Sequence, residues 1–171
     1  RLDAFHRDPH FHIAINVAAR HFANGLLLRD LHNYWFSVDP VQQLVVELTE
    51  RDVLQDGDQH MAEHLHFKGV QLAIDDFGTG YASYARLKTM NVDILKIDGS
   101  FIRNLLASSL DYQVVDSICR LARMKNMQVV AEYVESPEIR QAVITLGIDY
   151  MQGYDIGVPV PLTQLAEEMT G

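Results

Sequence analysis

The sequence predicts an α/β protein whose strands form a parallel sheet or barrel. Short apolar runs alternate with segments of helical periodicity six times along the chain. The links between them are too short for a separate domain, and no low-complexity stretch interrupts the alternation. Each apolar run also ends in a polar or charged residue. The predicted strands are 13–17, 44–50, 70–75, 92–98, 127–132 and 150–153.

The helices between these strands follow from apolar spacing and from residues that start or stop helices. Phe22, Leu26 and Leu27 are the expected buried positions of a helix over 18–35. Pro137 suits the first turn of a later helix and Gly147 suits its end. The other predicted helical segments lie around 61–67, 81–87 and 110–124 and from 162 to about 169, and residues 1–10 are predicted to be the tail of a helix or a lead-in loop.

The composition fits one globular domain. The chain has 171 residues, of which 48% are hydrophobic, and a mean hydropathy of −0.04. It contains no apolar run of membrane-spanning length and no signal segment. Its 23 acidic and 14 basic residues give a net charge of −9, which argues against binding a nucleic-acid polymer by charge neutralisation. An acidic pocket would instead recruit metal cations, and phosphates through them.

Cysteine usage and the first residue bear on the protein's surroundings. The single cysteine, Cys119, excludes an internal disulfide and suits a reducing compartment. It lies among Val115 and Ile118 on a predicted helix, so we expect a buried structural thiol rather than a nucleophile. The chain begins with Arg1 rather than Met, so we expect a fragment or a processed product.

The stretch from Leu72 to Gly80 carries the strongest chemical information. Apolar residues run directly into Asp75 and Asp76, and Gly78 then allows a positive φ angle. Neighbouring strand residues point to opposite faces, so Asp75 and Asp76 can both face the axis of a barrel only if the strand is already unwinding at its end. Adjacent carboxylates repel unless a cation lies between them, and hard divalent ions suit that position. A solvated turn is the alternative.

The polar residues that end the predicted strands indicate one shared site. In parallel α/β folds, reacting groups lie at the carboxyl ends of the strands. Carboxylates with an amide oxygen, and no cysteine cluster, favour Mg²⁺ or Mn²⁺ over zinc or copper. Two such ions roughly 3.5–4 Å apart would hold a phosphodiester and activate a water. The strand-end residues are Asn16, Glu47 with Glu50, Asp75 with Asp76, Lys96 with Asp98, Glu132 with Glu135, and Gln152.

These motifs resemble those of EAL domains, the cyclic di-GMP phosphodiesterases of bacteria. The resemblance implies a modified (β/α)8 TIM-like barrel that opens cyclic di-GMP to linear pGpG with two Mg²⁺ or Mn²⁺ ions. It extends from about Ile13 to Pro161. The matching segments occur in the family's order: Glu47-Leu48-Thr49-Glu50, Asp75 to Tyr81, Leu95 to Asp98, Ala131 to Glu135, and Gln152-Gly153-Tyr154.

The resemblance also implies roles for single residues. Lys96 matches the lysine that orients the attacking water, and Glu50 the glutamate that braces the loop from Asp76 to Tyr84 and helps couple dimerisation to metal binding. Glu132 completes the expected catalytic set of Lys96, Glu132 and Glu50. The expected metal ligands are Asn16, Glu47, Asp75, Asp76 and Glu132, and the expected substrate-binding residues are Asp76, Asp98, Glu135 and Gln152.

The sequence departs from the family pattern in places. The Glu-Ala-Leu segment is absent, so we expect residues 1–171 to form an EAL phosphodiesterase domain truncated at its N-terminus. About six of the eight βα units should be present, and two strands and one metal ligand should be missing. Tyr133 stands where the family usually has glycine, Ala82 where it has serine, and Val158 where a basic residue is common. We expect a cytoplasmic homodimer, whose full-length parent can carry an upstream sensory region or an inner-membrane attachment.

Other functions fit parts of the sequence. A catalytically inactive receptor that binds cyclic di-GMP is the main alternative. Lys96 at a strand end would also suit a Schiff-base lyase, although the nearby acids favour the charged ammonium over the neutral amine that this chemistry needs. His60 and His64 are spaced to hold zinc on one helix face, but a solvated helix surface is the simpler interpretation.

Overall fold

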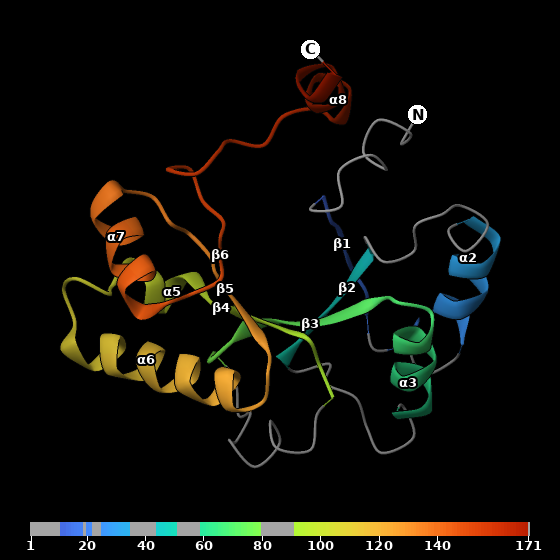
Figure 1. Ribbon diagram of the computed structural model, residues 1–171, viewed down its shortest axis with the longest axis horizontal. Coiled ribbons are helices and arrows are strands. Elements are labelled where there is room, and N and C mark those ends of the chain that lie inside the picture. Colours follow the sequence, from blue (N-terminus) through green and yellow to red (C-terminus); the bar gives the residue numbers. More distant parts are fainter. Residues whose placement is uncertain are drawn as a thin grey trace.

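The strands form one parallel sheet in which spatial order equals chain order, β1-β2-β3-β4-β5-β6. We analysed a computed structural model, which describes residues 11–18, 20–21, 25–34, 44–50, 59–79 and 91–170. The sheet curls into a half-barrel, so the predicted TIM-like α/β fold is confirmed (Figure 1). The strands are β1 Ile13–Asn16, β2 Leu44–Thr49, β3 Gln71–Phe77, β4 Ile94–Ile97, β5 Gln128–Ala131 and β6 Tyr150–Met151.

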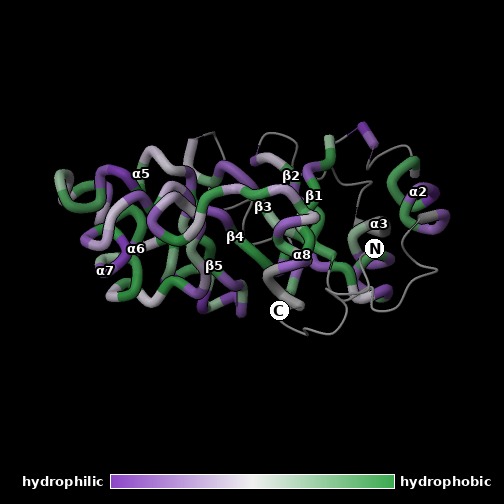
Figure 2. Tube along the Cα trace, turned by 90° about the horizontal axis from the view of Figure 1, so that it is seen from above, coloured by the Kyte–Doolittle hydropathy of each residue, from purple (hydrophilic) through white to green (hydrophobic). Residues whose placement is uncertain are grey.

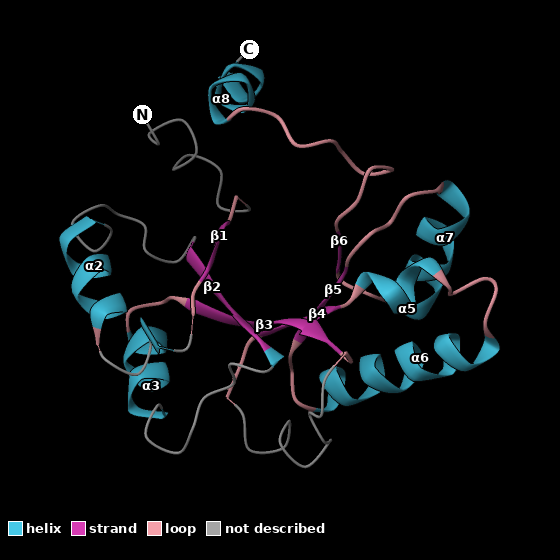
Figure 3. Ribbon diagram, turned by 180° about the vertical axis from the view of Figure 1, so that it is seen from behind, coloured by secondary structure: helices cyan, strands magenta, loops and turns pink. Residues whose placement is uncertain are grey.

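Helices cover the convex side of this sheet and leave its concave side open. Helices α2 and α3 flank one arm of the half-barrel and α5, α6 and α7 the other, whereas α8 lies across the opening (Figures 1 and 3). The helices are α2 Leu26–Tyr34, α3 Gln59–Phe67, α5 Gly99–Arg103, α6 Ser109–Met124, α7 Pro137–Leu146 and α8 Leu162–Thr170. None of the helices in the described ranges is long and apolar enough to cross a membrane.

The helix ends follow the predicted capping chemistry where the structure describes them. The hydroxyl of Ser136 accepts a hydrogen bond from the backbone N–H of Ile139 at 3.3 Å, next to Pro137 in the first turn of α7. Gly147 ends α7 with a φ of 67°, a left-handed conformation that glycine adopts readily. These caps confirm the predicted helix between Pro137 and Gly147.

Two helical expectations were incomplete. The helix predicted over 18–35 is interrupted. Arg20 and His21 are helical, and α2 begins at Leu26, because Gly25 has a φ of 71° and a helix cannot continue through that angle. Helix α5 was not predicted, since five residues are too few to display a helical period. The segments predicted around 1–10 and 81–87, with Ala82, lie outside the described residues, as does Phe22.

The apolar core has a convex and a concave part. The larger cluster fills the space between the strands and the helices, and its largest fully buried side chains include Leu44, Leu65, Leu72 and Leu95. Apolar stretches run along β1 and β4 in Figure 2. A smaller, separate cluster is formed by Val45, Ala73 and Ile94, with Val130 packed against it. Each of its members lies two residues before a predicted site residue.

Two aspartates clamp neighbouring strands at the amino ends of the sheet. Asp93 Oδ2 accepts the N–H of Leu72 at 2.7 Å, and the N–H of Asp93 returns a bond to the Leu72 carbonyl at 2.9 Å. Asp149 forms the same two bonds with Val129, at 2.8 and 3.1 Å. His66 Nε2 lies 2.8 Å from the same Asp93 oxygen. Both aspartates directly precede a strand, so they fix its position relative to the preceding neighbour.

The two remaining expectations for the scaffold concern Cys119 and the α3 histidines. Cys119 is buried on α6, and burial raises the pKa of its thiol to about 11, which confirms a structural role. His64 is exposed on α3, as expected for a solvated surface. The side chain of His60 lies outside what the structure describes.

Candidate active site

The predicted site residues converge because of the two-residue period of the strands. Side chains at positions i and i+2 of a strand share a face, so Glu47 follows Val45 onto the concave side. The other strand-end residues obey the same rule. The pairs are Ala14 with Asn16, Val45 with Glu47, Ala73 with Asp75, Ile94 with Lys96, Val130 with Glu132, and Tyr150 with Gln152.

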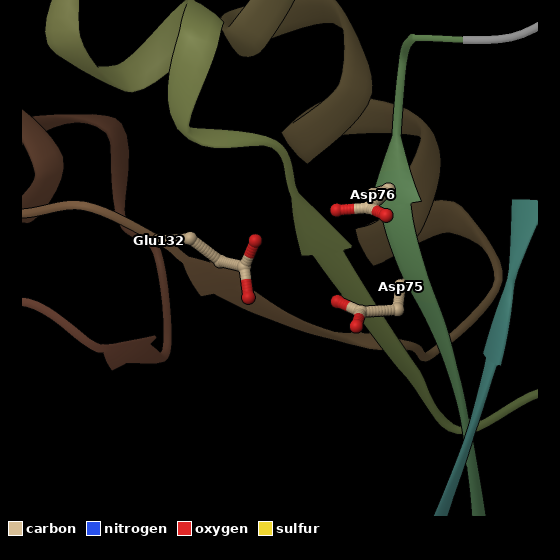
Figure 4. Close-up of side chains that lie close together, drawn as sticks. All are labelled: Asp75, Asp76 and Glu132. Carbon is tan, nitrogen blue, oxygen red and sulfur yellow. The ribbon is translucent and has the colours of Figure 1, made fainter. Parts of the chain in front are cut away.

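Asp76 reaches the same region through an irregularity in β3. The register between β3 and β4 shifts between Ile74 and Phe77, and Asp76 has a φ of 55°. This bulge turns the side chain of Asp76 toward Glu132, although the two-residue period of the strand would direct it to the opposite face. Figure 4 shows the carboxylates of Asp75 and Asp76 on the side of β3 that faces Glu132. The strand does not unwind at the aspartates as expected, because β3 continues to Phe77 and a bulge within it turns Asp76 instead. Gly78 has the expected positive φ, at 105°.

Lys96 lies at the centre of three carboxylates. Its Nζ is 2.8 Å from Asp75 Oδ1, 2.9 Å from Glu132 Oε1 and 3.1 Å from Glu47 Oε1. Lys96, Glu47 and Glu132 are each 7–8% exposed. Residues on β2, β3 and β4 and directly after β5 thus form one ionic group, in which Lys96 is the only cation, among the described residues, that pairs with these three acids.

Burial and charge shift the proton affinities within this group. Burial alone would lower the pKa of Lys96, but contacts with Asp75 and Glu132 and the charges of Glu132 and Glu47 raise it above its ordinary value. A lysine in this state is an ammonium, which argues against Schiff-base chemistry. Burial raises the pKa of Glu132, and the charges of Asp75 and Asp76 add to it, while Lys96 opposes both.

The acidic group has the chemistry of a divalent-cation site. Ligand oxygens of Asp75, Asp76 and Glu132 all lie within 4.8 Å of one another. Oxygens on opposite sides of a cation are about 4–5 Å apart when the bonds are about 2.0–2.6 Å long. Asp75 Oδ1 is buried and accepts no hydrogen bond from the described residues, although Lys96 pairs with its charge. These residues therefore fit a hard divalent ion.

A cavity of about 370 Å³ opens next to this group. Asp75, Asp76 and Glu132 form its acidic end, and Glu135 and Gln152 line it as well, so five predicted site residues share one cavity. Tyr133, Gly153 and Tyr154 complete the lining. The mixture of carboxylates, an amide and aromatic rings suits a polar ligand that also carries flat apolar groups.

Other predicted residues lie around the cavity rather than in its lining. Glu50, 3% exposed, accepts the backbone N–H of Gly78 at 2.9 Å and so supports the turn after the aspartates. Asp98 caps α5 by accepting the Ser100 N–H at 2.9 Å. Asn16 pairs in register with Glu47 but lines a different depression, beside α2.

Sequence reasoning noted Tyr133 as a departure from the family pattern, bulky enough at the rim to alter access to the pocket, and Tyr133 does line the cavity. It assigned no function to Tyr154 or Arg103. Tyr154 belongs to the segment Gln152-Gly153-Tyr154, so its position next to an expected site residue was a usable signal. Arg103 lies on the short helix α5, which the sequence pattern did not reveal.

An α/β half-barrel with clustered carboxylates and a lysine at the carboxyl ends of its strands is typical of metal-dependent barrel hydrolases. Comparison with known proteins gives the family. The chain belongs to the EAL domain family, whose profile matches residues 1–159.

Similar proteins share much of the sequence and the fold. The chain is 63% identical over 129 residues to the cyclic di-GMP phosphodiesterase PdeF of Escherichia coli K12, covering 74% of this chain and 17% of PdeF. It is 43% identical over 167 residues to the probable cyclic di-GMP phosphodiesterase PdeD of the same organism, covering 98% of this chain and 31% of PdeD.

A solved structure extends the comparison to the fold. The PaMucR phosphodiesterase in complex with c-di-GMP superposes with a TM-score of 0.84 at 38% identity, over 96% of this chain and 67% of that chain. This chain therefore spans less than a third of the length of PdeF or PdeD, but two thirds of this solved phosphodiesterase.

Proposed function

We propose that this chain carries the catalytic residues of a cyclic di-GMP phosphodiesterase that produces linear pGpG. The observation that carries the proposal is the convergence of Glu47, Asp75 and Glu132 around Lys96, beside a cavity. The names of the similar proteins and the family match support the same activity.

Two divalent ions, Mg²⁺ or Mn²⁺, would supply an activated water and stabilise the leaving oxygen. The residues proposed to hold them are Asn16, Glu47, Asp75, Asp76 and Glu132. Lys96, held by three carboxylates, would keep a positive charge next to the phosphoryl oxygens and orient the attacking water.

The surrounding residues would bind and orient the dinucleotide. Gln152 and Glu135 line the cavity and are available to contact the substrate, with Asp76 at the acidic end. Glu50 would hold the turn at Gly78, and thereby the aspartates, through its charge-assisted hydrogen bond. Asp98 was expected to contact substrate, but its bond to Ser100 favours a role in positioning α5.

Product analysis tests the proposal. The chain is incubated with cyclic di-GMP and Mg²⁺ or Mn²⁺, and the nucleotides are separated by chromatography. We expect pGpG with either metal, and none with EDTA or in Asp75→Asn and Glu132→Gln. Glu138→Gln, an exposed change on α7, is the matched control and should retain activity. An inactive receptor would bind the dinucleotide and release it uncut, and that result would contradict the proposal.

Assembly and location are separate proposals. We propose a homodimer, because the family resemblance gives the loop that Glu50 braces a role in coupling dimerisation to metal binding. We also propose a cytoplasmic location, with a sensory or membrane region attached in the full-length parent. Light scattering of the purified chain with and without Mn²⁺ measures the oligomeric state. A monomer under both conditions would argue against coupling between metal binding and dimerisation.

A further inference from the structure

The ring of Tyr133 forms part of the cavity wall and is held in an unusual backbone conformation. Tyr133 directly follows Glu132, just beyond the carboxyl end of β5, and its φ is 55°. Side chains disfavour this left-handed region, in which glycine is at ease. A non-glycine residue persists there when its contacts outweigh the backbone cost, and such positions cluster at functional sites.

The contacts that hold the ring come from one short helix. A Cβ atom at Gly99 would lie 2.1 Å from Tyr133 Cδ2, so only glycine at this position lets the ring approach α5 so closely. Arg103, four residues further along α5, places its Cζ 4.3 Å from the centre of the ring. Residues four apart share a helix face. The helix therefore presents a glycine and a cation to the same ring.

The remaining surface of the ring is available to a ligand. Tyr133 is 48% exposed and lines the cavity together with Asp75 and Glu132. Because Arg103 lies over one face, the other can face the cavity. A phenol ring contributes nothing to a hard cation, but it offers a flat apolar surface beside the acidic end. That is the surface on which a nucleobase stacks.

We propose that Tyr133 is a specificity-determining residue, whose ring stacks on one nucleobase of the bound cyclic dinucleotide while Gly99 and Arg103 hold the ring in place. This inference rests on the proposed function, because it takes the ligand of the cavity to be a cyclic dinucleotide. It adds a contact to the base, whereas the carboxylates and Lys96 act at the phosphodiester.

The first test separates base binding from metal binding. Tyr133→Gly removes the ring and relaxes the backbone, and Tyr133→Phe keeps the ring. Calorimetry with Mn²⁺ alone should give equal uptake in all three proteins, because Tyr133 is no metal ligand. With Ca²⁺ in place of Mn²⁺ to limit hydrolysis, Tyr133→Gly should bind cyclic di-GMP about 5- to 150-fold more weakly, the range typical of losing one base stack. Tyr133→Phe should bind within about twofold of the unaltered chain.

The second test detects stacking itself. A cyclic dinucleotide with 2-aminopurine in place of one guanine should lose fluorescence on binding to the unaltered chain and to Tyr133→Phe. At saturation with Tyr133→Gly, its emission should recover. Arg103→Met removes the cation behind the ring and should weaken binding about 2- to 10-fold, with Arg103→Lys intermediate.

The possible outcomes are distinct. Unchanged affinity and unchanged quenching in Tyr133→Gly, with normal Mn²⁺ uptake, would overturn this inference and leave the proposed function intact. Failure of the unaltered chain to bind or cleave cyclic di-GMP would instead count against the proposed function. Equal losses of Mn²⁺ uptake and dinucleotide binding in Tyr133→Gly would show that the residue acts only on local structure, which also overturns the inference.

Discussion

Replacement of Lys96 by methionine should destabilise the metal-free protein strongly and the metal-loaded protein much less. Methionine keeps most of the volume of the lysine stem but removes the ammonium that lies within 3.1 Å of three carboxylates, the only cation paired with them in the described part of the chain. Removing one partner of a buried ionic group costs about 3–5 kcal/mol, because the remaining charges stay buried without compensation. The total stability of a domain is only about 5–15 kcal/mol, so Lys96→Met should unfold much more readily in EDTA.

Urea unfolding with and without Mn²⁺ measures both effects. At a concentration 100 times its dissociation constant, a bound ion stabilises a folded protein by about 2.7 kcal/mol. Without the competing ammonium, the variant should bind Mn²⁺ more tightly, and each tenfold gain adds about 1.4 kcal/mol of rescue. Arg20→Met, an exposed change that also removes a positive charge, is the matched control and should cost less than about 0.5 kcal/mol. A metal-free Lys96→Met as stable as the unaltered chain would refute this reasoning.

Three further outcomes follow from other contacts. Glu50→Ala removes the acceptor of the Gly78 N–H and should cost about 1.5–3 kcal/mol of stability in urea unfolding, with weaker Mn²⁺ uptake by calorimetry; normal uptake would contradict a supporting role. Gly153→Ala would place a Cβ 2.2 Å from the Val134 carbonyl, so we expect a loss of about 1–3 kcal/mol, and an unchanged melting temperature would contradict this close approach. Cys119, with its pKa raised to about 11, should resist iodoacetamide at pH 8 and react only after urea unfolding, whereas rapid native labelling would show that the thiol is accessible.

The strands and the chemistry of the site could be predicted because both depend on local patterns. Apolar runs marked all six strands, and the two-residue period placed Glu47, Asp75 and Lys96 on one face once the strands were parallel. The acids at the strand ends then indicated a cation site, and Asp75, Asp76 and Glu132 do cluster closely enough that they could hold a metal ion.

The features that the sequence did not reveal depend on contacts between distant segments. The cap formed by Asp98 belongs to α5, a helix too short to detect, so the sequence did not reveal the structural bond of this residue. The break at Gly25 was hidden because apolar residues continue on both sides of it. The Tyr133 ring packs directly against Gly99, and these residues belong to different segments, so no spacing in the sequence indicates that contact.

Asp93 and Asp149, at the amino ends of the strands, fix the register on which the positions of side chains at the carboxyl ends depend. A slip of one residue displaces a strand by about 3.3 Å and directs every side chain to the other face. The same slip between β3 and β4 would carry Lys96 out of reach of Asp75, which lies 2.8 Å away. By bonding to Leu72 from the start of β4, Asp93 thus fixes the register that keeps Lys96 next to Asp75, although Asp93 lies at the opposite end of these strands. We therefore expect substitutions of Asp93 to misalign the two strands that carry Asp75 and Lys96.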